Sequence, residues 1–563
     1  MAERRLAITI KGAVSLGAYE AGAIAQTLDL IAHNNANNST KWYIDAACGA
    51  SAGSMTSGIL AAALLTGNID VLRSTWVSGV SLGVLAPQGK KLSPNSILDV
   101  AALDTLAGDN LKFPAIVKPH LAMRPGPSQL ELRFTLSRFA PNVISENTLN
   151  KTKLEFRDFK DSADFTVAIR QDAALGTVLD VSTKDVAAWN YSKPGDALTG
   201  ADAWDAMVQT AIASGSFPFA FAPRDLRRFV NGGWMNQYFQ DGGTFDNDPV
   251  GETINIAHDI DWSGKDEAAH FADVDRRFMM IHVEPFVGSA PAQPKRPEKT
   301  LDVNPLELIK NYFPSVMEES ETSGLQGIVT VNRKIDEREQ FLTQLAEMVM
   351  TGGVQAIPQS VLDALADYRK LKDRLKFFLD NLIPDLASTA PVAFAKALAF
   401  TAAQKDVFSG LALAYDLATN LADKVKVRPI LIAPEKNLSG SGLFAFGGFL
   451  VDAFRERDYR QGRYDAYQAW KVIAEVPNEF VLDPKAPAVP GAAEDLFRAH
   501  QDEYQTAIGE LTIRFKAVIG ALSDAAAGSG LGGFVLARLI SAALDGIAEH
   551  FLKQAGDVPP GGG

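Results

Sequence analysis

A sharp turn between a strand and a helix constrains the fold of this chain more than any other segment. Residues 42–48 are typical of a strand, residues 54–65 are typical of a helix, and Gly67 supplies a stop signal for that helix. The turn between them, residues 49–53, reads Gly-Ala-Ser-Ala-Gly. Because flanking glycines permit a strained backbone, the turn would lift the hydroxyl of Ser51 off the sheet edge. The pattern therefore predicts an α/β fold in which Ser51 is an exposed nucleophile.

A helix start with a capping serine would explain the same five residues without any catalysis. Glycine is frequent in this chain, with 45 of 563 residues, so a G-x-S-x-G pattern is weak support on its own. Under the catalytic interpretation, Gly49 and Gly53 are the glycines of a nucleophile elbow. Two further segments favour that interpretation.

The first of these segments is a loop of small residues near the start of the chain. Residues 11–22 follow a strand-like run at residues 6–10. A loop between a strand and a helix leaves backbone N–H groups unpaired at the helix N-terminus, where they bind anions, including the oxyanion of acyl transfer. The candidate donors are the amides of Gly12, Ala13 and Val14. An ordinary tight connection is the alternative interpretation of this loop.

The second segment is a glycine turn that opens with an acidic residue. Asp241 is followed by Gly242 and Gly243, and alone this pattern is typical of a solvated Asx turn. Taken with the other two segments, it completes an ordered set of oxyanion loop, nucleophile and base. A carboxylate is a weak base near neutral pH, so we expect Asp241 to be buried against apolar side chains, which would raise its pKa.

This ordered set resembles the patatin-like phospholipase family, which is marked by a glycine-rich oxyanion loop, a G-x-S-x-G serine and an aspartate in D-G-[GA]. Two further blocks extend the resemblance: residues 247–249 read N-x-P, and residues 213–223 are similar to the family's A-S-x-x-x-P-x-x-F-x-P segment. The resemblance implies a three-layer α/β fold with a mainly parallel central sheet. It also implies hydrolysis of phospholipids or related acyl-ester lipids through a dyad of Ser51 and Asp241, without a histidine.

The oxyanion loop departs from the usual family pattern. Consecutive glycines and a basic residue are expected there, whereas this chain has Gly12-Ala13-Val14 and then Leu16. The loop is similar to the K-G-x-V-S-L version of a bacterial subgroup, and residues 446–466 are similar to that subgroup's F-G-G-F…D-Y…G-R-x-D-A block. Backbone donors survive a change from glycine to alanine, so the oxyanion site need not be lost.

Three alternatives to the dyad hydrolase remain open at this point. A Ser-His-Asp triad would place a histidine after the acid, and His282 is the best candidate, although its apolar strand pattern favours a core histidine. A non-catalytic lipid-binding or interaction protein on the same scaffold would explain the altered loop. An acyltransferase would use the same residues, Ser51 and Asp241, with an acceptor other than water.

Metal and cofactor signatures are missing from the sequence. The seven histidines are scattered and show no paired-ligand spacing, and the acidic run at residues 241–248 lacks the alternation of a calcium loop. We therefore expect no metal and no cofactor. Cys48 is the only cysteine, which excludes an intrachain disulfide and fits a reducing compartment.

The charge balance restricts the partners that this chain can have. It has 54 basic and 67 acidic residues, a net charge of −13, which argues against nucleic acid as the main partner. Contact with a membrane surface would need a local apolar or basic patch. A signal peptide at residues 1–5 and beyond is rejected, because its cleavage would remove the oxyanion loop. We expect a cytoplasmic protein that acts on a phospholipid or another acyl-ester lipid and that contacts membranes peripherally.

A chain of this length is expected to form more than one core. We predict a catalytic α/β domain at residues 1–290, a linker with a helical insertion at 291–425, and a returning strand with a helical C-terminal region at 426–563. The returning strand is expected within residues 427–434. An amphipathic helix at 534–552 is expected to pack on the core, with a membrane-surface helix as the alternative.

Overall fold

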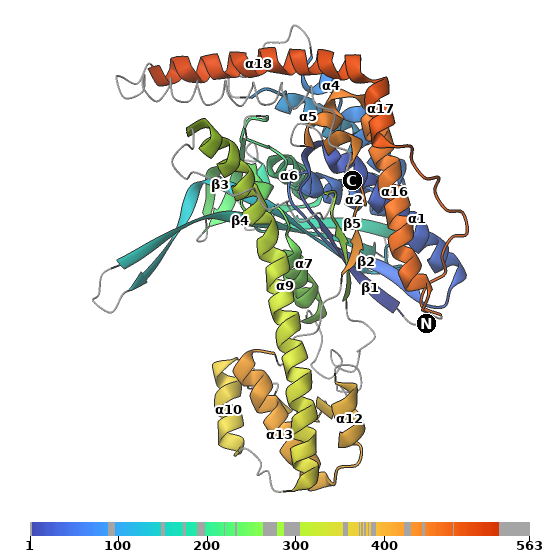
Figure 1. Cartoon of the computed structure of the whole chain (residues 1–563), viewed down its shortest axis with the longest axis vertical. Helices are drawn as coiled ribbons and strands as arrows, with labels where there is room; N and C mark the ends of the chain where they lie inside the picture. The colour runs from blue at the N-terminus through green and yellow to red at the C-terminus, as the bar shows by residue number, and fades with distance from the viewer. Residues whose placement is uncertain are drawn as a thin grey trace, which may run out of the picture. The chain divides into compact units, whose positions relative to one another are not determined.

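The computed structural model describes most of the chain (Figure 1). The described residues are 3–87, 96–147, 153–172, 176–188, 198–218, 220–230, 233–262, 278–286, 305–352, 358–370, 372, 375–376, 379–380, 382–383, 390–421, 429–441, 445–476 and 478–527. The chain divides into two compact units, the first made of residues 1–256, 280–323 and 430–563 and the second of 257–279 and 324–429.

The first unit is built on one mixed sheet with the strand order β11-β10-β1-β2-β3-β4-β5-β7, to which β9, β8 and β6 add a branch from β3. The strands are β1 (Glu3–Ile10), β2 (Lys41–Gly49), β3 (Ser128–Asn147), β4 (Lys153–Asp172), β5 (Gly176–Thr183), β6 (Val186–Ala188), β7 (Leu198–Thr199), β8 (Arg224–Val230), β9 (Gly233–Asp241), β10 (Phe278–Val283) and β11 (Ile430–Ile432). Pairing is parallel for β1–β2, β2–β3 and β10–β11, and the β3–β4 and β3–β9 pairs are antiparallel. The predicted α/β class is confirmed, and the strand expected within 427–434 is β11.

Strands β1 and β2 read as nearly continuous buried runs, which is typical of parallel strands that are covered on both faces. Their register pairs Ile10 with Gly49, so both strands end at the same edge of the sheet. The next strand pairs Phe134 with Gly49, and two positions further along β3 Leu136 pairs with Asp241 of β9. This register brings the ends of three distant segments to one edge.

Three helices of the first unit contact this part of the sheet: α1 (Gly17–Asn37), α2 (Ala52–Thr66) and α6 (Gly200–Ser214). Helix α2 ends where the sequence predicts, because Gly67 adopts the left-handed conformation with φ +68° and its N–H caps the Ala63 carbonyl. Helix α6 packs on α2 as well as on β3 and β5.

The subgroup block near the C-terminus forms α15 (Gly447–Leu450) and α16 (Asp452–Ala474), and α16 lies along α1 (Figure 1). The two helices approach closely at paired glycines. A Cβ on Gly22 would lie 1.9 Å from the Tyr459 carbonyl oxygen, and a Cβ on Gly462 would lie 2.0 Å from the Tyr19 carbonyl oxygen. The glycine and tyrosine positions of this block therefore serve helix packing.

Over the residues that the structure describes, the second unit is mainly helical, and it also takes in the end of α7 (Val250–Trp262) and the first two residues of β10. Its helices are the later part of α9 (Pro305–Thr351), α10 (Gln359–Tyr368), α12 (Pro391–Ala397) and α13 (Ala402–Thr419). Arg338 donates two hydrogen bonds of 2.7 Å to Asp416, and both side chains are buried. This bidentate pair joins α9 to α13 beside an apolar core that includes Leu342, Phe408 and Ala412.

Several sequence predictions fall outside the described residues. The helix expected at 534–552 lies there, as do residues 287–304 and 422–428, where the predicted domain boundaries at 290 and 425 fall. The three-part division of the chain thus stays a prediction. Among the described helices, none is both long enough and apolar enough to cross a membrane.

Candidate active site

The predicted elbow is a strained turn at the end of β2. Ser51 has φ +52° and ψ −121°, and it is the residue before the first turn of α2. A Cβ on Gly49 would lie 2.3 Å from the Gly53 carbonyl carbon, and a Cβ on Gly53 would lie 2.2 Å from the Ile10 carbonyl oxygen. Glycine is required at both positions by close approach of the backbone, which is how the sequence holds Ser51 in this conformation.

Ser51 and Asp241 meet in the folded chain. The Ser51 hydroxyl donates a hydrogen bond of 2.5 Å to Asp241 Oδ2, and the two residues are 4% and 1% exposed. Asp241 is the last residue of β9, and its backbone N–H donates to the Ser216 carbonyl at 3.0 Å. A nucleophile and a base within hydrogen-bond reach are the arrangement that acyl transfer requires.

The turn after β9 fixes the carboxylate of Asp241. Its Oδ1 accepts a hydrogen bond of 2.8 Å from the Gly243 N–H, while Oδ2 faces Ser51. A Cβ on Gly242 would lie 2.2 Å from the Thr135 carbonyl oxygen, so this glycine lets the turn pack against β3. The Asx turn is therefore present, but it is buried rather than solvated.

Burial changes the acidity of this carboxyl group. Desolvation raises the pKa of Asp241 from 3.8 to about 7, and the hydrogen bonds from Ser51 and Gly243 oppose that rise only in part. A carboxylate with a pKa near neutrality is a far better proton acceptor than an exposed one, because it matches the working pH more closely.

The loop after β1 offers fewer free donors than the sequence suggests. The Gly12 N–H donates to the Asn247 carbonyl at 3.0 Å, and the Asn247 side-chain amide donates back to the Gly12 carbonyl at 3.2 Å. Among the described residues, the amides of Ala13 and Val14 donate to no acceptor, and the same holds for Ala52 at the start of α2. Gly12 thus anchors the loop, while these three amides are left for an anion.

The Ser51 backbone is held by a series of hydrogen bonds between buried serine hydroxyl groups. The Ser51 N–H donates to Ser214 Oγ at 3.0 Å, Ser214 donates to Ser54 Oγ at 2.8 Å, and Ser54 donates to the Gly49 carbonyl at 2.7 Å. No sequence pattern indicated this role for Ser214, although the residue lies in the block at residues 213–223. The sequence pointed to Ser214 only through the position of this block, which precedes Asp241 in the chain.

An apolar cavity opens beside the nucleophile. At the reactive end it is lined by Val14, Ser51 and Ala52, and the other described residues that line it are uncharged. The apolar part includes Trp76, Val80, Leu85, Phe217, Phe221 and Phe449. Its free volume is about 20 Å³, which is room for about one water molecule, so an acyl chain would have to displace side chains.

His282, the candidate for a triad, faces Asp248 rather than Ser51 or Asp241. Its Nε2 is 3.1 Å from Asp248 Oδ1, and its side chain is buried in β10. Within the described part of the chain, Ser51 and Asp241 form no hydrogen bond with a histidine. This geometry favours the dyad over the triad.

Comparison with known families covers the same region as the site. Residues 8–254 match the family model described as Patatin-like phospholipase, and this range includes the loop after β1, the elbow and the turn after β9. No curated protein matches the chain.

Proposed function

The chain belongs to the patatin-like phospholipase family through residues 8–254, and we propose that it hydrolyses lipid esters with Ser51 as nucleophile and Asp241 as base. The observation that carries the proposal is the 2.5 Å hydrogen bond from the Ser51 hydroxyl to the buried Asp241 carboxylate. Family membership supports lipid-ester hydrolysis as the activity, and the hydrogen bond supports the assignment of the two roles.

In the acylation step, Ser51 Oγ attacks the ester carbonyl carbon while its proton passes to Asp241 Oδ2. The carbonyl π electrons move to oxygen, and the resulting oxyanion is stabilised by the free amides of the loop and of Ala52. When the tetrahedral intermediate collapses, the C–O bond to the alcohol breaks and Asp241 returns its proton to that alcohol. The product of this half-reaction is an acyl group bonded to Ser51.

In the deacylation step, water takes the place of the serine hydroxyl. Asp241 accepts a proton from water as the water oxygen attacks the acyl carbon. When this tetrahedral intermediate collapses, the bond from the acyl carbon to Ser51 Oγ breaks, the carboxylic acid leaves, and Asp241 gives the proton to Oγ. The raised pKa of Asp241 suits both steps, because the group must accept a proton and release it in each cycle.

The cavity favours an acyl chain over a polar group next to Ser51. Its lining is aliphatic and aromatic, and none of the described lining side chains is charged. Apolar chains are stabilised in such surroundings by burial, whereas a phosphate headgroup would lose its hydration without gaining a partner. We therefore place the acyl chain in the cavity and the alcohol part of the ester toward solvent.

A serine-reactive fluorophosphonate probe and an acyl ester test the proposal together. The wild type is expected to be labelled at Ser51 and to hydrolyse the ester, and Ser51→Ala is expected to lose both properties. Ser57→Ala is the matched control, because Ser57 is a buried serine of α2 whose hydroxyl donates to the Gly53 carbonyl at 2.8 Å. Full turnover by Ser51→Ala would refute the proposal.

The acyltransferase alternative uses the same acyl-enzyme but a different second substrate. Products formed in the presence of glycerol or a lysolipid separate the two: free fatty acid as the main product supports hydrolysis, and acylated acceptor as the main product assigns transfer. A non-catalytic scaffold predicts no adduct on Ser51 and no product of either kind.

A further inference from the structure

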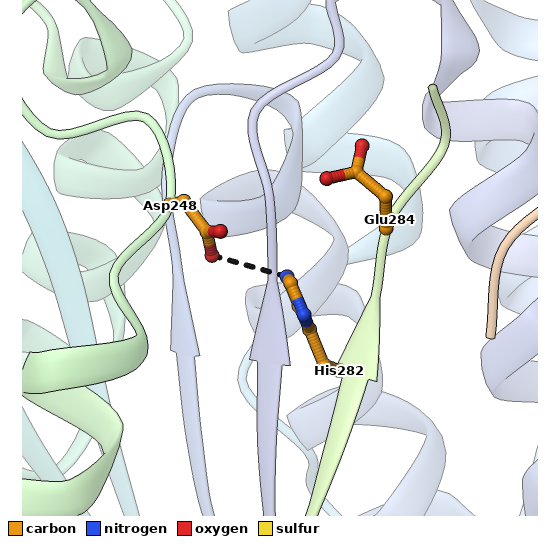
Figure 2. A group of neighbouring side chains, drawn as sticks. All are labelled: Asp248, His282 and Glu284. Carbon is orange, nitrogen blue, oxygen red and sulfur yellow. Dashed lines mark ion pairs between the residues drawn. The ribbon is translucent and has the colours of Figure 1, made fainter. Parts of the chain in front are cut away.

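Three further ionisable side chains gather where β10 ends and α7 (Val250–Trp262) begins (Figure 2). Asp248 lies just before α7, His282 is in β10, and Glu284 directly follows that strand. One ligand atom from each side chain lies within 4.8 Å of the others. The proposed reaction at Ser51 uses none of the three.

Two of these side chains are buried without hydrogen-bond partners. Asp248 is fully buried, and within the described residues neither of its carboxylate oxygens accepts a hydrogen bond. His282 is 2% exposed, and its Nε2 is also without a hydrogen-bond partner there. Burial of an ionised carboxylate is strongly unfavourable unless another group compensates the charge. The arrangement therefore calls for a cation.

The distances between the three side chains are compatible with a metal ion bound between them. His282 Nε2 is 3.1 Å from Asp248 Oδ1, yet the ring nitrogen makes no hydrogen bond to that oxygen. Figure 2 shows the Nε2 end of the imidazole between the carboxylates of Asp248 and Glu284. Two ligand atoms bound tetrahedrally to one Zn²⁺ at roughly 2.0–2.2 Å lie about 3.3–3.6 Å from each other, so the 3.1 Å separation of His282 Nε2 and Asp248 Oδ1 is slightly shorter than in such a site.

The charges around the group leave one negative charge uncompensated when His282 is neutral. Lys11 Nζ is 2.7 Å from Glu284 Oε2, so this pair is balanced and Asp248 is not. A proton on His282 or a bound metal ion would supply the missing positive charge.

Glu284 has the capacity to bind a metal in addition to its present partners. Its Oε2 accepts from Lys11, and its Oε1 accepts a hydrogen bond of 3.0 Å from the Phe286 N–H. A carboxylate offers about four lone-pair sites, so lone pairs remain on both oxygens.

We propose that Asp248, His282 and Glu284 form a binding site for a divalent transition metal, with Zn²⁺ as the ion that fits best. One imidazole nitrogen and two carboxylate oxygens are a donor set that suits Zn²⁺, whereas Mg²⁺ and Ca²⁺ prefer oxygen ligands alone. This site departs from the sequence-based expectation of no metal. The spacing of the three residues in the sequence gave no signal, because Asp248 lies before α7, far along the chain from His282 and Glu284.

Zinc binding by the full-length chain tests the site directly. Protein stripped with a chelator is titrated with ZnCl₂ by calorimetry, and thermal unfolding is followed with and without the ion. We expect one Zn²⁺ per chain and a higher melting temperature in its presence. Replacement of one ligand in His282→Ala or Glu284→Gln is expected to weaken binding at least about 100-fold.

His500→Ala is the matched control, because His500 also lies 3.0 Å from an acidic side chain, Glu503, but at the surface. The control is expected to bind Zn²⁺ like the wild type. Absence of binding, or equal affinity in the wild type and in Glu284→Gln, would overturn the proposal.

A second measurement covers the case in which the variants fail to fold. The imidazole signals of ¹⁵N-histidine-labelled wild type are recorded by NMR while Zn²⁺ is added. A shift of the Nε2 signal of one buried histidine at one equivalent supports the site. A protonated His282 whose signals do not change would assign the missing charge to a proton, and the metal proposal would be wrong.

Discussion

Two buried aspartates of the same turn region, Asp241 and Asp248, have opposite surroundings. Asp241 accepts hydrogen bonds from the Ser51 hydroxyl and the Gly243 N–H, whereas Asp248 accepts none from the described residues and faces His282. Both are almost completely hidden from solvent. Burial alone therefore does not decide what a carboxylate does. Its donors decide whether it exchanges a proton with a neighbour or holds a charge that a cation must balance.

The largest effect on ester hydrolysis is expected from replacement of Asp241, and Asp246 of the same turn provides the comparison. Asp241→Asn keeps the shape of the side chain but cannot accept the Ser51 proton, so we expect ester hydrolysis to fall roughly 10⁴-fold or more. Asp246→Asn is the control: burial raises the pKa of Asp246 too, to about 6, but no described contact joins it to Ser51. We expect this control to remain within a few-fold of wild-type kcat/KM. Comparable losses in both variants would contradict the assignment of the base.

The next effect tests the loop after β1, which Asn247 holds through hydrogen bonds with Gly12. A Cβ on Gly12 would lie 2.1 Å from Asn247 Oδ1 and 2.9 Å from Ser51 Cβ, so Gly12→Ala must displace the loop. We expect kcat to fall about 10²–10³-fold, as when one oxyanion donor is lost. Gly58→Ala is the control, because its Cβ would meet only Ala211 at 3.7 Å. Steady-state kinetics of both variants would show the difference, and an unchanged kcat in Gly12→Ala would remove the loop from the mechanism.

The third effect concerns stability against pH. The pKa of Asp241 is about 7 in the folded chain and 3.8 as the ordinary value, so between these limits the folded state binds more protons than the unfolded state. Wild-type stability should therefore fall as pH rises from about 4 to about 7, by roughly 4 kcal/mol from this group.

Asp241→Asn lacks this titration, while the other raised acids remain in both proteins and cancel in the comparison. Urea unfolding at pH 4.5 and pH 8 should show that the variant gains stability relative to the wild type at the higher pH. A constant difference between the two proteins would mean that Asp241 is not desolvated as described.

The smallest effect concerns the support of the nucleophile. Ser214→Ala leaves the buried Ser51 N–H without an acceptor, so we expect a loss of about 1–3 kcal/mol in stability and about tenfold in kcat. Ser216→Ala is the control, because its hydroxyl donates to the Ile212 carbonyl near the same helix end and does not contact Ser51. Chemical denaturation and kinetics of the pair would show whether the hydroxyl chain serves Ser51 specifically. Equal losses in kcat would argue against that role.

The sequence by itself determined the local parts of the site. Gly49 dictates the strained turn through its close approach to the Gly53 carbonyl, and Gly67 dictates the end of α2, because both constraints come from nearby residues of the chain. The chain order of loop, serine and acid was sufficient to indicate the family, and residues 8–254 match its model. The expected cytoplasmic location and peripheral membrane contact stay predictions.

Only the tertiary structure decided which of these parts touch. Strand register across β2, β3 and β9 brings Ser51 to Asp241, and it also hides the carboxylate so that its pKa rises. In the folded chain the Gly12 amide donates to the Asn247 carbonyl, and the Ser51 amide donates to the Ser214 hydroxyl. The fold also brings Asp248, His282 and Glu284 together. Such contacts join residues that are far apart along the chain, and their strength depends on burial, which no local pattern of residues encodes.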